Sequence, residues 1–220
     1  MARDDGPLYV YALAEAPVAS RLRILGRPLR TLRAGGLAAI VDGRDWQPSG
    51  EVHALQEQHE ILVRLARRVP ALLPVRFGSR LEEARLRAVL SEHETVITAA
   101  LDHVRDCCQM TLRLIGPPDV TTPSDVRTDG GAAYLRSRRA RLVHRPAEVH
   151  AVGEALGTLV RDERVESGHA GIRATVFHLV PRERIETYRT RALVLQQALA
   201  PVRLTITGPW PPFAFAPQLL

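Results

Sequence analysis

The segment at positions 207–215, TGPWPPFAF, constrains the fold of this chain more than any other. Before it, residues 202–207 alternate apolar and polar side chains, which is the period of a strand with one buried face. Gly208 and Pro209 are expected to end this strand, because proline has no N–H to offer a neighbouring strand. Two further prolines hold the next residues near polyproline II geometry. The sequence therefore predicts a C-terminal strand followed by a stiff, extended segment.

Three aromatic side chains are concentrated on this segment. Trp210, Phe213 and Phe215 account for one of the two tryptophans and two of the four phenylalanines. Either the rings fold back and close the core of their own domain, or they present a preorganised apolar surface to another protein. Under the second interpretation the candidate partner-binding residues are Gly208, Pro209, Trp210, Pro211, Pro212 and Phe213.

Length and composition indicate a globular protein. With 220 residues, 45% of them hydrophobic, the chain can bury one large core or two small ones. No stretch approaches the ~18 consecutive apolar residues of a membrane-spanning helix. Asp4, Asp5 and Glu15 interrupt the N-terminal region, which therefore differs from a signal peptide. We expect a cytoplasmic protein.

All thirty basic residues are arginine, and the formal net charge is +6. The planar guanidinium binds phosphate bidentately, so nucleic acid is one candidate partner. A complete absence of lysine is explained more simply by a bias toward GC-rich codons. An excess of basic residues indicates nonspecific electrostatic attraction rather than a particular function. No specific nucleic-acid partner is therefore expected.

The first half of the chain opens with strand patterns. Short apolar or alternating runs at 8–13, 27–33 and 36–41 read as strands, and 72–77 reads as a buried strand that enters a turn at Gly78. A helical pattern separates the strand at 72–77 from the first three strands.

Three helices are predicted in the same half. In the first, over 51–69, apolar residues recur at spacings of three and four, and Pro70 ends the helix. Two more are expected over 81–90 and 92–104, followed by a strand over 108–114. The stripe of the first helix is expected to face the core and consists of Val52, Leu55, His59, Leu62, Ala66 and Val69.

The second half follows a segment of loop composition. Residues 117–131 contain three prolines and two glycines without apolar periodicity, which predicts a domain boundary. Beyond it we expect a helical stretch over 132–160 that Pro146 kinks or restarts, a strand over 172–180 and a helix over 185–199.

This order of elements predicts the fold class. Each half mixes helices with a few strands, which is an α+β pattern built on two small split-βαβ sheets. The predicted domains are an N-terminal domain over 1–118 and a C-terminal domain over 130–220.

The motifs of common chemistries are missing. The sequence has no GxGxxG, Walker, GxSxG or HExxH motif. His53 and His59 fall on different faces of their helix, which argues against a metal site with Glu57. Cys107 and Cys108 would point to opposite faces of a strand and imply neither a disulfide nor a metal site. We expect no catalytic residue, no metal and no cofactor.

Six strings occur along the chain: YVYAL (9–13), GLAAIVD (36–42), HEILVRL (59–65), LLPVRFGS (72–79), AAYLRSRR (132–139) and TGPWPPFAF (207–215). Together and in this order they resemble the gas vesicle proteins of the L and F type (GvpL/GvpF). The resemblance covers nearly the whole chain, and LPVRFG and GPWPPFAF are its specific parts. Outside the C-terminal motif the family-matching residues are His59, Pro74, Arg76, Phe77, Gly78, Tyr134 and Leu135.

The resemblance implies a non-catalytic protein needed to build gas vesicles, located in the cytoplasm and on the vesicle. Its implied partners are the small, very hydrophobic shell protein and other gas vesicle accessory proteins. It also implies two α+β domains, the C-terminal one ferredoxin-like. We hypothesise that a strand edge with aromatic anchors holds a shell subunit that would otherwise aggregate through its own edges and apolar faces.

Two other functions stay open. One is an arginine-rich, ferredoxin-like RNA-binding module, which the predicted strand 172–180 disfavours because it lacks the glycine and spaced aromatics of the RNP1 pattern. The other is an enzyme with an unfamiliar site that depends on one of the histidines.

Overall fold

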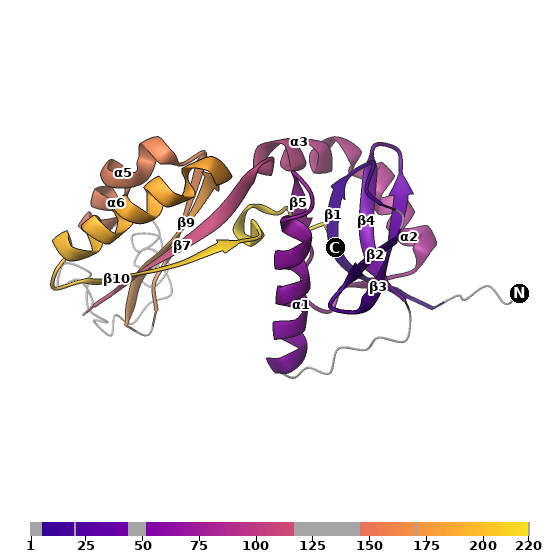
Figure 1. Cartoon of the computed structure of the whole chain (residues 1–220), viewed down its shortest axis with the longest axis horizontal. Helices are drawn as coiled ribbons and strands as arrows, with labels where there is room; N and C mark the ends of the chain where they lie inside the picture. The colour runs from indigo at the N-terminus through magenta and orange to yellow at the C-terminus, as the bar shows by residue number, and fades with distance from the viewer. Residues whose placement is uncertain (1–5, 20, 44–51, 117–145, 170, 220) are drawn as a thin grey trace, which may run out of the picture. The chain divides into compact units, whose positions relative to one another are not determined.

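The computed structural model forms two compact units (Figure 1). It describes residues 6–19, 21–43, 52–116, 146–169 and 171–219. The first unit comprises Met1–Cys108 with Trp210–Leu220, and the second comprises Gln109–Pro209. These units differ from the predicted ranges 1–118 and 130–220, because the second unit begins earlier and the C-terminal residues group with the first. The predicted boundary segment 117–131 lies outside the described residues.

The first unit holds a six-stranded sheet. Its elements are β1 (Leu8–Glu15), β2 (Arg21–Ile24), β3 (Arg27–Ala34), β4 (Leu37–Asp42), α1 (Val52–Ala66), β5 (Leu72–Pro74), β6 (Arg80–Leu81), α2 (Glu83–Glu92) and α3 (Glu94–Val104). The strand order is β2-β3-β4-β1-β5, with β6 also paired to β1. β1 is antiparallel to β4, β5 and β6, and β2, β3 and β4 form an antiparallel meander. This sheet is therefore not the split-βαβ sheet expected for this half.

Helices cover both faces of this sheet. Adjacent residues of β1, such as Leu8 and Tyr9, are both 0% exposed although their side chains point to opposite faces. On one face, Ile61, Leu62 and Leu65 of α1 pack into a core with the strands. α2 contacts β3, and α3 contacts β1 and β5, which accounts for the burial of the other face.

The buried face of α1 differs from the predicted stripe. The residues buried along α1 are Ala54, Gln58, Ile61, Leu62 and Leu65. Only Leu62 belongs to both sets. The stripe was misassigned because Gln58 is polar, yet its amide oxygen accepts a hydrogen bond from the Tyr9 hydroxyl and its amide nitrogen donates to the Val75 carbonyl at 3.4 Å. A polar side chain with hydrogen-bond partners can occupy a position in the core, and the pattern of apolar residues in the sequence does not reveal such a position.

The second unit has the βαββαβ order of a ferredoxin-like fold in its described residues. Its elements are β7 (Cys107–Ile115), α5 (Ala147–Leu156), β8 (Asp162–Ser167), β9 (Ile172–Pro181), α6 (Ile185–Ala198) and β10 (Arg203–Trp210). The sheet order is β10-β7-β9-β8. α5 begins directly after Pro146, which is its N-cap, so this proline starts a helix. The α+β class is confirmed for the whole chain.

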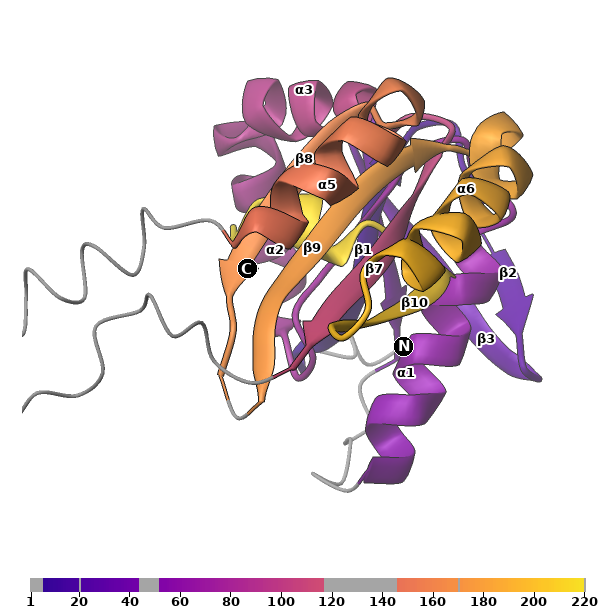
Figure 2. The ribbon, with the colours of Figure 1, turned by 90° about the vertical axis from the view of Figure 1, so that its left-hand side faces the viewer.

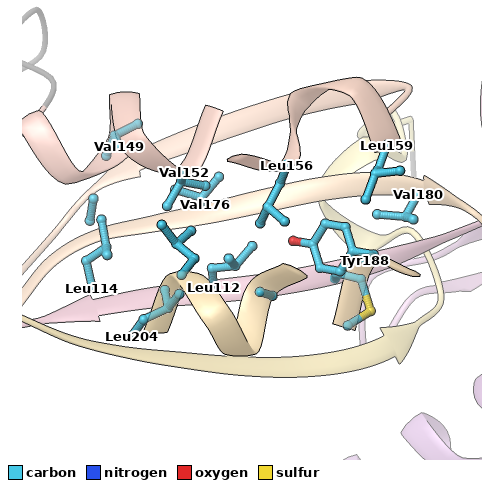
Figure 3. Close-up of a cluster of buried hydrophobic side chains, with 14 of the residues drawn as sticks. Leu112, Leu114, Val149, Val152, Leu156, Leu159, Val176, Val180, Tyr188 and Leu204 are labelled. Carbon is cyan, nitrogen blue, oxygen red and sulfur yellow. The ribbon is translucent and has the colours of Figure 1, made fainter. Parts of the chain in front are cut away.

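One hydrophobic core joins the helices of this unit to its sheet. Figure 2 shows α5 and α6 on the same face of the sheet. In Figure 3 the side chains of Val152 and Leu156 from α5 meet Leu112 and Val176 from the strands, with Tyr188 of α6 beside them. Tyr188 is 0% exposed, so its ring belongs wholly to this core.

Candidate partner-binding surface

The C-terminal motif begins inside a strand. β10 continues to Trp210, so the prediction that Gly208 and Pro209 end the strand is wrong. β10 lies at the edge of its sheet, beside β7 alone, where a proline without an N–H breaks no central ladder. Gly208 has φ +125°, and a Cβ at this position would lie 2.8 Å from the Gln109 carbonyl oxygen and 2.8 Å from Met110 Sδ. The close approach of β7 therefore requires glycine here.

After Trp210 the chain turns instead of running on in polyproline II geometry. Pro212 has φ −77° and ψ 61°, and the Phe213 N–H donates to the Pro211 carbonyl at 2.8 Å, which is an inverse γ-turn. A 3₁₀ turn follows at Phe213–Phe215, where the Phe215 N–H donates to the Pro212 carbonyl at 3.1 Å. Both prolines are buried, so they fix the direction of the aromatic side chains.

His59 of α1 joins this segment to the first unit. Its ring centroid lies 4.9 Å from that of Trp210, edge to face at 64°, and 5.9 Å from that of Phe213, nearly parallel at 16°. Phe215 is 3% exposed, with its ring centroid 6.4 Å from that of His103. The two phenylalanines of the motif therefore lie in different environments. Phe215 closes the core, whereas Phe213 remains 39% exposed.

Two exposed apolar residues of α1 lie on the same side of the helix as His59. Leu55 precedes His59 by one turn and is 47% exposed, and Val52 is 70% exposed. We call Val52, Leu55, His59, Trp210 and Phe213 the aromatic surface. Grouped apolar exposure of this kind marks interaction sites in soluble proteins. The apolar period of the sequence assigns Val52 and Leu55 to the buried stripe, so it does not reveal their exposure.

The other specific string, LPVRFG, forms the turn between β5 and β6. Pro74 is buried at the end of β5, and Arg76 is exposed. The Ser79 N–H donates to the Arg76 carbonyl at 3.2 Å, and Gly78 has φ +85°, as a turn with a positive φ at its third residue requires. The Gly78 N–H donates to the Tyr9 hydroxyl at 3.1 Å, which ties the turn to β1.

Of the remaining family-matching residues, Phe77 is half-buried within the same turn. Tyr134 and Leu135 lie outside the described residues, as does the arginine-rich string around them.

A charged network holds α1 against the sheet. Arg27 of β3 donates to Asp42 of β4 at 2.9 Å and to Glu57 of α1 at 2.6 Å. The Tyr11 hydroxyl donates to Asp42 at 3.3 Å. Burial raises the pKa of Tyr11 well above its ordinary value, and the nearby Asp42 carboxylate raises it further. Burial lowers the pKa of Arg27, but its hydrogen bonds to Glu57 and Asp42 and the electrostatic effect of Tyr11 and Asp42 together raise this pKa by more, so Arg27 keeps its charge.

His178, which interrupts the apolar pattern of β9, is a satisfied core histidine. It is 1% exposed, with Nδ1 2.8 Å from the Tyr188 hydroxyl and Nε2 3.1 Å from Glu163 of β8. Of its two partners, Tyr188 is 0% exposed, whereas the side chain of Glu163 is 26% exposed.

Neither a metal site nor a membrane span is found in the part of the chain that the structure describes. No three His, Cys, Asp or Glu side chains there are grouped closely enough to hold a metal ion. Likewise, none of the helices described above is both long and apolar enough to cross a membrane. Glu57, a candidate ligand beside His53, pairs with Arg27 instead.

The comparisons with known proteins decide the family. The family model described as "Gas vesicle synthesis protein GvpL/GvpF" matches residues 7–217. The chain belongs to the GvpL/GvpF family. No curated protein matches this GvpL/GvpF member.

Two crystal structures support the family fold. GvpF from Anabaena sp. PCC7120 is similar with a TM-score of 0.74 at 11% identity, covering 96% of each chain. GvpF from Microcystis aeruginosa has the same TM-score and identity and covers 96% of this chain and 99% of its own. At this identity the likeness establishes the shared fold, and the resemblance inferred from the six strings is confirmed.

Proposed function

We propose that this GvpL/GvpF protein is a non-catalytic assembly factor that binds the hydrophobic gas vesicle shell protein through the aromatic surface. One observation carries the proposal: Phe213 is 39% exposed and stacks on His59 at 5.9 Å, and Leu55, one helical turn before His59, is 47% exposed. The other residues proposed to support binding are Gly208, Pro209, Trp210, Pro211 and Pro212, which fix the path of the chain. Other gas vesicle accessory proteins are its proposed second partners, and the protein acts in the cytoplasm and at the vesicle.

The geometry suits binding without chemistry. The buried prolines and the γ-turn hold Phe213 in place, so little conformational entropy is lost when a partner covers it. Large aromatic anchors of this kind dominate protein interfaces. A shell subunit covered at its apolar face is kept from aggregating until it is added to the growing shell. The assembly step therefore requires only that binding to the incoming subunit be reversible.

Alanine variants distinguish side chains that bind the partner from side chains that close the core. Phe213→Ala and Leu55→Ala should weaken binding of purified shell protein by ~2 kcal/mol or more, with little change in the free energy of unfolding. Phe215→Ala should instead lower the free energy of unfolding by ~3 to 5 kcal/mol. The half-buried Trp210 is tested in both assays. The matched control is Val96→Ala on α3, which truncates a 51% exposed apolar residue outside the aromatic surface. Wild-type binding by Phe213→Ala, Leu55→Ala and Trp210→Ala alike contradicts the proposal.

The RNA-binding alternative has less support. A ferredoxin-like RNA-binding sheet stacks two or three bases on aromatic side chains of its central strands. The two central strands here, β7 and β9, carry one phenylalanine, Phe177, and no tyrosine or tryptophan. Binding of nucleic acid should accordingly be weak and depend on salt.

A further inference from the structure

A cleft lies at the C-terminal end of α1, within the first unit. Its volume is about 290 Å³. The walls of the cleft include the apolar residues Val18, Leu22, Leu65 and Val69, and its rim carries the charged residues Glu15 and Arg68. Leu55 of the aromatic surface and Leu65 of the cleft are separated by about 15 Å along the helix.

Hydrogen bonds hold one wall of the cleft in place. The segment 16–19 runs along β3 and β4, where the Ala16 N–H donates to the Gly36 carbonyl at 2.9 Å. Thr31 Oγ1 donates to the Ala19 carbonyl at 2.7 Å, and Arg33 donates to the Val18 carbonyl at 2.6 Å. The cleft is therefore preformed, and a ligand does not have to order it.

The floor of the cleft is apolar and incompletely covered. Leu22 and Val69 pack against the buried core of the first unit, yet both are only partly buried. Water in contact with these side chains is released when an apolar group fills the space, which favours binding. The cleft therefore selects a large apolar side chain.

The rim has one cation without a carboxylate partner among the described residues. Glu15 is paired with Arg105 at 2.8 Å. The Arg68 guanidinium contacts the Arg23 carbonyl at 3.4 Å, a weak bond, and no carboxylate in this part of the structure. A carboxylate that a ligand brings to the rim would therefore pair with Arg68. The one acid at the rim, Glu15, is already paired with Arg105.

We propose that this cleft docks a segment of a partner protein that places a large apolar side chain next to a carboxylate. The apolar side chain fills the space over Leu22 and Val69, and the carboxylate pairs with Arg68. The inference does not depend on the aromatic surface, which uses the other end of α1, and it adds a second, charge-selective interaction site to the protein.

Peptide probes test both halves of this recognition on the full chain. A labelled peptide rich in leucine and glutamate should bind, as followed by fluorescence anisotropy. Matched peptides with lysine for glutamate, or serine for leucine, should bind at least about tenfold more weakly. Arg68→Glu should weaken the leucine–glutamate peptide by about tenfold and favour the lysine peptide. The matched control, Arg67→Glu, makes the same charge change at an exposed residue outside the cleft and should alter affinity by less than about threefold.

A second variant tests the apolar wall. Leu22→Ser, with its fold checked by circular dichroism, should also weaken the leucine–glutamate peptide. Equal losses for Arg67→Glu and Arg68→Glu would show diffuse attraction and overturn the proposal. Unchanged affinity in Leu22→Ser, or no binding of the leucine–glutamate peptide up to about 1 mM, overturns it as well.

Discussion

Two constraints meet at Gly208. Its φ of +125° lies in a region that other residues rarely adopt, and the space that a Cβ needs is occupied by Gln109 and Met110 of β7. A side chain here must push β7 away or change the backbone before the aromatic residues. The glycine of the GPWPPFAF string is therefore explained by packing, independently of any partner.

We predict that Gly208→Ala lowers the free energy of unfolding by about 1 to 3 kcal/mol, because it adds both backbone strain and a clash. Chemical denaturation measures the change. Gly153→Ala is the control: this glycine lies inside α5, and the added Cβ meets no heavy atom within 4 Å other than its chain neighbours and the nearby backbone of its own helix. It should raise stability by about 0.5 to 1 kcal/mol. An equal gain in both variants would contradict the assigned role of Gly208.

Tyr11 predicts how stability depends on alkaline pH. Its hydroxyl is buried beside Asp42, and its pKa in the folded protein is raised above the ordinary value near 10. Above pH ~10 the unfolded chain ionises this tyrosine while the folded chain keeps it neutral. The stabilisation is therefore complete below pH ~10 and is lost as the pH rises further, by up to ~1.4 kcal/mol per pH unit. Tyr11→Phe should lose stability less steeply than the wild type when both are denatured between pH ~9 and ~11. Identical slopes would show that this hydroxyl is not buried.

At the level of elements, the strands and helices with clear apolar periods were predictable. β1, β3, β4, β9 and α6 lie close to the expected ranges. β2 was missed because its hairpin turns through Leu25 and Gly26, with φ 52° and 77°, where a leucine replaces the usual Asn or Asp signal. β8 was missed because four of the six residues in its sequence, DERVES, are charged, as suits a sheet edge.

The candidate site was only half predictable. The aromatic segment could be identified from the sequence, since its prolines and rings are local signals. The contribution of α1 could not, because the rotation of a helix depends on which polar residue finds a buried partner, and Gln58 finds Tyr9. Because the apolar period assigns Leu55 to the buried stripe, it also fails to show that Leu55 is exposed on the surface.

The observed rotation of α1 gives a direct test. Ile61 is 0% exposed, so Ile61→Ala should lower the free energy of unfolding by about 2 to 5 kcal/mol. Leu55→Ala removes a side chain that is 47% exposed and should change it by less than about 0.5 kcal/mol. Thermal or urea denaturation ranks the two variants. The reverse ranking would restore the stripe expected from the sequence.

At the level of the whole molecule, the two units exchange chain segments. β7 is an inner strand of the second sheet, but it precedes the predicted boundary 117–131. Trp210–Leu220 follows the second unit in sequence and groups with the first. A search for loop composition cannot find such a division, because the chain passes between the units along the continuous strands β7 and β10.

This exchange predicts an unusual result for limited proteolysis. The proline- and glycine-containing segment 117–131 remains the expected first site of cleavage, and Arg127 offers trypsin a position within it. Cleavage there leaves β7 on the N-terminal fragment, while β8, β9, β10 and Trp210–Leu220 stay on the other. Each unit then contains pieces of both fragments. We therefore expect the cleaved protein to elute as one species in native buffer and to separate into two only in guanidinium chloride. Elution of two separately folded fragments in native buffer would instead support independent domains at 1–118 and 130–220.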